Sequence, residues 1–167
     1  MCSPQYYAGL DIHKKTISYC VKCADGLIVD EGVIKSTRSE LHGWTAQHAE
    51  CTVGLESTMF TGWIYDVLVA DGLETKVAHP YRLRAIAAGK KKNDQVDART
   101  LADLLRCNLF PECYMAPEDM RNLRRVLRFR NMLVQQSVRM KNKTAGLLME
   151  VGAEYNKKRL FGKKYLD

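Results

Sequence analysis

The order of strand-like and helix-like runs in the N-terminal half limits the folds open to this chain. Residues 6–23 carry β-favouring and apolar side chains on both sides of a short polar break, and residues 27–36 continue the pattern after a turn at 24–26. We expect these runs to form an antiparallel meander of three strands. Two more strands are predicted over 51–58 and 74–80, the last one closed by a proline.

Helix-like runs separate these strands. Residues 39–49, for which Ser36 or Ser39 is a candidate cap, and residues 59–72 place apolar side chains at helical spacing, and a further helix is predicted over 100–109. The order β-β-β-α-β-α-β-α predicts an α/β fold in which helices cover the faces of a mixed sheet. A chain of 167 residues with 46% apolar side chains is long enough to bury such a core, as one domain or one domain with a helical appendage.

A different pattern follows Pro111 and Pro117, since no proline occurs from Glu118 to about Gly152. Four apolar residues recur there at every seventh position: Val126, Leu133, Met140 and Leu147. The companion column is mostly polar: Leu123, Arg130, Ser137 and Thr144. We expect a long amphipathic helix with the features of an imperfect coiled coil. The predicted organisation has three parts: an α/β domain at 1–110, a connector at 111–117 and a basic helical segment at 118–167.

Charge is distributed unevenly along the chain. Residues 1–80 hold 6 Lys and Arg against 10 Asp and Glu, whereas residues 81–167 hold 20 against 9, for a net charge of +7. This asymmetry is typical of a protein whose second half binds a polyanion, and it is equally compatible with a solvated basic surface. Ten basic residues are candidate nucleic-acid contacts: Lys14, Lys90, Lys91, Lys92, Arg121, Arg124, Arg125, Arg128, Lys141 and Lys143.

The six cysteines do not form a ligand pattern. Cys20 and Cys23 have CxxC spacing, but they lie inside a strand-like run with no second CxxC or histidine pair at zinc-ligand spacing. We interpret all six as reduced structural thiols: Cys2, Cys20, Cys23, Cys51, Cys107 and Cys113. No secretory leader opens the chain and no apolar run approaches the ~20 residues of a membrane span, so a cytoplasmic protein without membrane contact is predicted.

Four acids are candidates for one cleft. Asp11 lies within the first apolar strand, where a buried carboxylate needs compensation, and Glu56 ends another strand. Asp94 and Asp97 are three residues apart, so on a helix both carboxylates point the same way. If the strands carrying Asp11 and Glu56 are neighbours, the four acids converge and repel unless cations neutralise them. Two hard divalent ions, about 4 Å apart, would satisfy such a site.

Two of the acids, Asp94 and Asp97, also have an ordinary structural interpretation, whereas Asp11 lies within a strand and needs a partner. Asp94 is a possible helix N-cap, and Asp97 a possible partner of Arg99 or Lys92. The three consecutive lysines directly before these aspartates favour the functional interpretation, because lysines attract the phosphates that carboxylate-bound metals must touch.

These residues resemble a known family. Asp11 in GLDIHKKT, Glu56 in LEST, and the segments VAHPYRLRAIA and KKKNDQVDARTLADLL are similar to the DEDD transposases of bacterial insertion sequences. That family includes Piv-type invertases and recombinases guided by a bridge RNA. RNLRRVLRFRNMLVQQSVRMKNK and KKRLFGKKYLD are similar as well, so the likeness spans nearly the whole chain.

The resemblance implies an RNase H-like fold of the RuvC type, with a mixed five-stranded sheet followed by a long C-terminal helix. It implies that four acids bind Mg²⁺ or Mn²⁺ and are catalytic: Asp11, Glu56, Asp94 and Asp97. It also implies DNA as the partner, possible use of a guiding RNA, and a helical segment that forms a homodimer or a higher oligomer. Family members then continue into a second domain with a nucleophilic serine; Ser137 lies in the helical segment and is not assigned that role.

Three functions follow from these observations. The first is metal-dependent phosphodiester cleavage or strand transfer during DNA transposition. The second is a stand-alone nuclease that is selective for branched DNA and uses the same acids. The third is a non-catalytic module that binds nucleic acid and dimerises, with the acids placing a structural metal.

Overall fold

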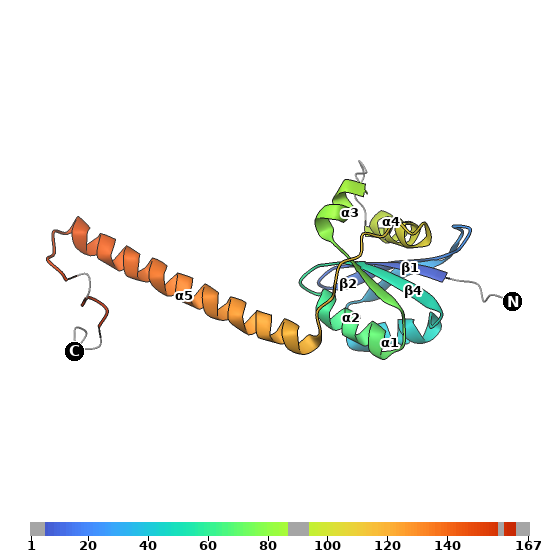
Figure 1. Ribbon diagram of the computed structural model, residues 1–167, viewed down its shortest axis with the longest axis horizontal. Coiled ribbons are helices and arrows are strands. Elements are labelled where there is room, and N and C mark those ends of the chain that lie inside the picture. Colours follow the sequence, from blue (N-terminus) through green and yellow to red (C-terminus); the bar gives the residue numbers. More distant parts are fainter. Residues whose placement is uncertain (1–5, 87–93, 157–158, 163–167) are drawn as a thin grey trace. The chain divides into compact units, whose positions relative to one another are not determined.

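The computed structural model describes residues 6–86, 94–156 and 159–162, together with the backbone but not the side chains of Asp94 and Gln95. The chain divides into two compact units, residues 1–118 and 119–167. The first unit contains a five-stranded sheet with four helices (Figure 1). Its strands are β1 (Tyr6–Ile12), β2 (Thr16–Cys23), β3 (Ile28–Lys35), β4 (Cys51–Glu56) and β5 (Thr75–Ala78). Its helices are α1 (Arg38–Gln47), α2 (Thr61–Ala70), α3 (Pro80–Ile86) and α4 (Asp94–Arg106).

The sheet is mixed and has the order β3-β2-β1-β4-β5. β1, β2 and β3 form the predicted antiparallel meander, which is confirmed. β4 and β5 then extend the sheet in parallel with β1, because the helices α1 and α2 provide the crossovers. The predicted mixed α/β architecture is therefore confirmed.

Helices cover both faces of the sheet (Figure 1). Alternate residues of β1 point to opposite faces. Ala8, Leu10 and Ile12 belong to one cluster with the buried side chains of α1 and α2. A second, smaller cluster contains Leu101 and Leu104 of α4 together with Ala78 of β5 and Leu83 of α3. α4 lies on the face opposite α1 and α2, so helices cover the central strands on both sides, whereas the edge strand β3 remains largely exposed.

Two predicted helices differ from the structure at their ends, and a further helix was not predicted. Thr37, rather than Ser36 or Ser39, caps α1: its hydroxyl accepts a hydrogen bond from the backbone N–H of Glu40. The predicted helix 59–72 is shorter, since α2 begins at Thr61 and ends at Ala70. The strand predicted over 74–80 is shorter: β5 begins at Thr75 and ends at Ala78. Pro80 instead begins α3, a helix that was not predicted from the sequence. Proline fits the first turn of a helix, because its missing N–H has no intrahelical partner there.

The helix predicted over 100–109 is displaced in the structure. It begins at Asp94 and ends at Arg106. Asn108 has a φ of 55°, the left-handed conformation that ends a helix, and its N–H donates to Leu105 while that of Leu109 donates to Leu104. This C-terminal motif stops the helix before the predicted end.

Residues 111–117, predicted as a connector, lie along β5 within the first unit. Glu112 forms an antiparallel bridge with Ala78, and the N–H of Cys113 donates to the carbonyl of Val77. The second unit contains α5 (Glu118–Glu150), whose extent agrees with the predicted long helix. α5 has no buried residue, and Gly152, two residues after its end, has a positive φ. In the described part of the chain, no helix is both long and apolar enough to cross a membrane.

Candidate functional site: an acid pocket at the carboxyl edge of the sheet

A pocket of about 120 Å³ lies where β1, β4, α3 and α4 meet. Three of the four acids singled out in the sequence line it. The cavity, which we name the acid pocket, is lined among the described residues by Asp11, Glu56, Leu83, Arg84, Asp97, Thr100 and Leu101. Residues far apart in the sequence therefore contribute carboxylates to a single cavity.

The strand register brings Asp11 and Glu56 to the same edge. β1 and β4 are adjacent and parallel, with Leu10 opposite Leu55, so the two acids are the next residues on neighbouring strands. The expectation that these strands are neighbours is confirmed. Both strands carry the same tripeptide, Gly-Leu-acid, at residues 9–11 and 54–56.

The glycines of these tripeptides allow α4 to lie close to the sheet. A Cβ atom on Gly9 would lie 2.0 Å from the carbonyl oxygen of Ala98 and 2.6 Å from the backbone nitrogen of Ala102. On β4, a Cβ on Gly54 would lie 2.7 Å from side-chain atoms of Leu105 and Phe110. Because glycine and acid are two residues apart on each strand, both point to the face that α4 covers. Close backbone packing thus places Asp97, which directly precedes Ala98, beside the strand acids.

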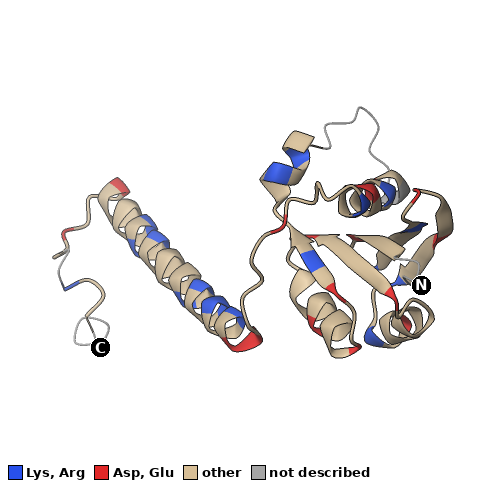
Figure 2. Ribbon diagram, turned by 45° about the vertical axis from the view of Figure 1, so that its right-hand side comes forward, with Lys and Arg blue, Asp and Glu red and all other residues tan. Residues whose placement is uncertain are grey.

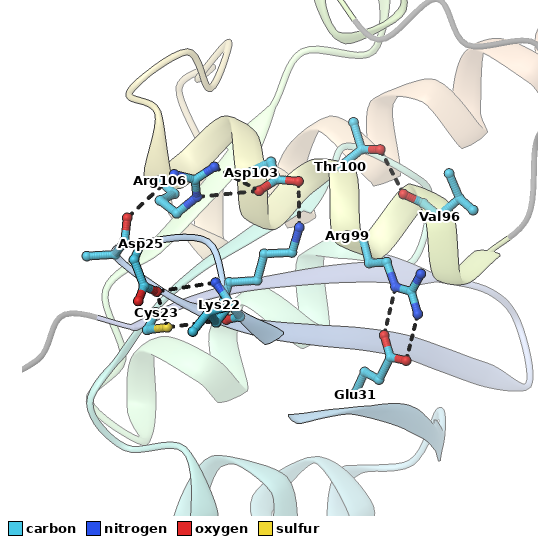
Figure 3. A network of polar contacts seen from close by, with 11 residues as sticks. Lys22, Cys23, Asp25, Glu31, Val96, Arg99, Thr100, Asp103 and Arg106 are labelled. Carbon is cyan, nitrogen blue, oxygen red and sulfur yellow. Dashed lines mark hydrogen bonds and ion pairs between the residues drawn. The ribbon is translucent and has the colours of Figure 1, made fainter. Parts of the chain in front are cut away.

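Ion pairs also tie α4 to the sheet (Figure 3). Arg99 donates two hydrogen bonds to Glu31 on β3, at 2.8 and 2.7 Å. This fork lowers the pKa of Glu31 and raises that of Arg99, because each charge stabilises the other. Further along α4, Asp103 accepts a hydrogen bond from Lys22 of β2, whose side chain is only 9% exposed. These contacts fix the rotation of the helix that carries Asp97. The observed partner of Arg99 is Glu31 rather than Asp97, the partner considered in the sequence.

Two residues at the site were not assigned a role from the sequence. The Nε2 of His13 lies 3.0 Å from Oδ2 of Asp11, whose side chain is 16% exposed, so the imidazole orients this carboxylate. Arg84 lines the acid pocket from α3. The segment VAHPYRLRAIA, which contributed to the family resemblance, contains Arg84 and was the available signal.

The other predicted site residues either lie away from the acid pocket or fall outside the described residues. Lys90, Lys91, Lys92 and the side chain of Asp94 are outside the described residues. Lys14 is exposed in the turn between β1 and β2. The remaining predicted contacts are on α5, where basic side chains recur along the helix and acids stand at its ends (Figure 2). Those contacts are Arg121, Arg124, Arg125, Arg128, Lys141 and Lys143.

The donor chemistry of the acid pocket suits a hard divalent cation, because three carboxylates supply the oxygen ligands that Mg²⁺ and Mn²⁺ prefer. Within the described residues, no three His, Cys, Asp or Glu side chains are grouped closely enough to hold one ion. The fourth predicted ligand, Asp94, has no described side chain, but it lies one helical turn before Asp97 on α4.

A family model described as a transposase, for the IS110 type of DEDD enzyme, matches residues 8–152. The chain belongs to the DEDD transposase family. Comparison with curated proteins gave no match. For this DEDD family member, the matched span covers most of β1 and all of β4, α4 and α5.

Solved structures show the same fold. RuvC of T. thermophilus in complex with a Holliday junction substrate has a TM-score of 0.50 and 12% identity, over 65% of this chain and 99% of that chain. Another T. thermophilus RuvC structure has a TM-score of 0.45 at the same identity and coverage. The structure with the TM-score of 0.50 confirms the predicted RuvC-type, RNase H-like fold of this DEDD family member.

Proposed function

We propose that this chain cleaves or transfers phosphodiester bonds of DNA at the acid pocket, with divalent metal ions as cofactors. The observation that carries the proposal is the convergence of Asp11, Glu56 and Asp97, from three different elements, on one cavity. Membership of a transposase family and a RuvC-like fold support DNA as the substrate.

In this proposal Asp11, Glu56 and Asp97, with Asp94 as the fourth ligand, hold Mg²⁺ or Mn²⁺. Ions bound there would activate water and stabilise the charge on the phosphate undergoing attack. His13 keeps the Asp11 carboxylate oriented, and the contacts of Gly9 and Arg99 keep α4 in place, so the ligands are positioned before DNA arrives. The lysines at 90–92 and the basic residues of α5 anchor the DNA backbone.

A cleavage assay on DNA tests the proposal. The chain is incubated with labelled linear duplex and with a four-way junction, in Mg²⁺ or in EDTA. We expect cleavage only with metal, and its loss in Asp11→Asn, Glu56→Gln and Asp97→Asn. Glu50→Gln is a matched control, because Glu50 is exposed and lies outside the acid pocket. Cleavage that persists in the three acid variants would refute the assignment.

The same assay separates the two other functions. A structure-selective nuclease is favoured by the resemblance to a RuvC that was solved with a Holliday junction substrate; it requires faster cleavage of the junction than of the linear duplex. A non-catalytic module is favoured by α5, which is basic and has no buried residue; it requires tight binding with no cleavage of either DNA. Including an RNA competitor tests whether RNA binds as well.

A further inference from the structure

A cation, Arg84, lines the acid pocket together with the three carboxylates. The preceding residue, Leu83, is 8% exposed and packs with Ala78, Leu101 and Leu104. This buried leucine fixes the backbone of α3 next to the pocket, while the side chain of Arg84 is exposed. The core therefore determines where Arg84 lies, and solvent or a ligand can reach its guanidinium.

Arg84 differs from the arginines of α4. Arg99 and Arg106 each hold a carboxylate. Among the described residues, Arg84 makes no hydrogen bond or ion pair, although Asp11, Glu56 and Asp97 line the same cavity. The guanidinium and the acids thus face a shared space of about 120 Å³ without closing it. Since about 10–15 Å³ of such space holds one water, the pocket has room for a group of several atoms.

A group that suits both walls of this pocket carries anionic oxygens. Such oxygens accept hydrogen bonds from a guanidinium on one side and complete the coordination of carboxylate-bound cations on the other. A DNA phosphodiester has this chemistry. Arginine suits the role because it stays protonated and presents a planar fork that matches two phosphate oxygens.

We propose that Arg84 contacts the DNA phosphate seated at the acid pocket and donates hydrogen bonds to its non-bridging oxygens. This inference rests on the proposed function and adds a substrate-contacting residue to it. A fixed positive charge beside the reacting phosphate stabilises the negative charge that develops during attack.

Two neighbouring arginines permit a matched cleavage test. Arg82 lies two residues earlier on α3, is exposed and, within the described chain, does not line the pocket. We expect Arg84→Gln to lower the rate of cleavage by about 10²–10³-fold, the usual loss for one donor to developing charge, and Arg84→Lys to recover part of it. Arg82→Gln should cleave at nearly the wild-type rate. All three variants should melt like the wild type, because neither arginine has a partner to lose in the described residues.

Binding provides a readout that does not need cleavage. Duplexes that each carry one uncharged methylphosphonate are titrated with wild type and Arg84→Gln in Ca²⁺. If Arg84 contacts one phosphate, neutralising that phosphate weakens DNA binding by wild type but not by Arg84→Gln. The effects of the methylphosphonate and of the substitution on the binding free energy are then non-additive at that position alone. Arg82→Gln should show no such coupling at that position.

The outcomes are distinct. Coupling at one phosphate, without cleavage by any protein, keeps the Arg84 contact and rejects the proposed function. Equal cleavage by wild type and Arg84→Gln, with additive effects at every phosphate, rejects the Arg84 contact and keeps the proposed function.

Discussion

At the residue scale, the site depends on two glycines as much as on its acids. In both Gly-Leu-acid tripeptides the leucine is fully buried on the side of α1 and α2. The glycine lies against α4, and the acid lines the acid pocket. A side chain at Gly9 would separate α4 from β1, and with it Asp97 from Asp11. The glycines therefore control the spacing of carboxylates to which they make no contact.

Gly9→Ala should destabilise the fold. Its methyl group would overlap the backbone of Ala98 and Ala102, which cannot rotate away, so we expect a loss of about 1–3 kcal/mol in the free energy of unfolding. Gly43→Ala in α1 is the control, because nothing lies within 4 Å of its added Cβ; there we expect a gain of about 0.5–1 kcal/mol. Urea unfolding of both variants measures the difference, and equal stabilities would contradict the close approach of α4.

The pair of Glu31 and Arg99 should appear in the dependence of stability on pH. Folding lowers the pKa of Glu31 from its ordinary 4.5, so the pair stabilises the protein above that pH, and the stability is lost as the pH falls through the lowered value. Glu31→Gln should have a lower free energy of unfolding than wild type at pH 7, and the difference between the two proteins should shrink in acid. Glu50→Gln should follow wild type throughout. A Glu31→Gln deficit that is the same at pH 7 and at pH 3 would contradict the ion pair.

At the element scale, α5 exposes an apolar stripe that no described residue of its own unit buries. Val126, Leu133, Met140 and Leu147 are 64, 47, 67 and 48% exposed. A helix with this pattern associates with another apolar surface, and a second copy of α5 offers the same stripe. Self-association was predicted from the sequence and remains a prediction.

Leu133→Glu should dissociate the oligomer. Gln135→Glu introduces the same charge two residues later, about 200° around the helix, and should leave association unchanged. Light scattering of the two variants and of wild type measures the mass of each. A monomeric wild type, or equal dissociation by both substitutions, would argue against this interface; adding DNA tests whether the basic residues of α5 must first be neutralised.

At the scale of the whole molecule, the excess positive charge lies in the second half, and the acids of the pocket come from both halves. We therefore expect substitutions of the basic residues to impair DNA binding, and substitutions of the acids to impair cleavage. Replacing Lys90, Lys91 and Lys92 with alanine should weaken DNA binding and reduce the slope of log Kd against log salt by about 0.9 for each lost phosphate contact. Asp97→Asn should retain the full slope. Filter binding over a salt series measures the affinity for DNA and its salt dependence. If Asp97→Asn binds DNA as poorly as the triple variant, Asp97 has a structural role rather than a catalytic one.

Much of this architecture was predictable because its causes are local. Alternation in residues 6–36 defined the meander, and Gly72 and Gly152 marked helix ends. The end of α4 was harder to predict from the sequence, since it depends on Asn108 adopting a left-handed conformation. Arg84 could not be placed in the pocket from the sequence, because its position follows from the burial of Leu83 against α4, a tertiary contact.

Titration with Mn²⁺ is the most direct test of the central claim that the acid pocket is a divalent-metal site. Calorimetry or electron paramagnetic resonance on the full chain, without DNA, measures the number of ions bound and their affinity. We predict about two ions at most per chain, bound by wild type and by Glu50→Gln and lost or greatly weakened in Asp11→Asn and Asp97→Asn. Mn²⁺ binding that is the same in all four proteins, or absent from wild type at millimolar metal, would contradict the account.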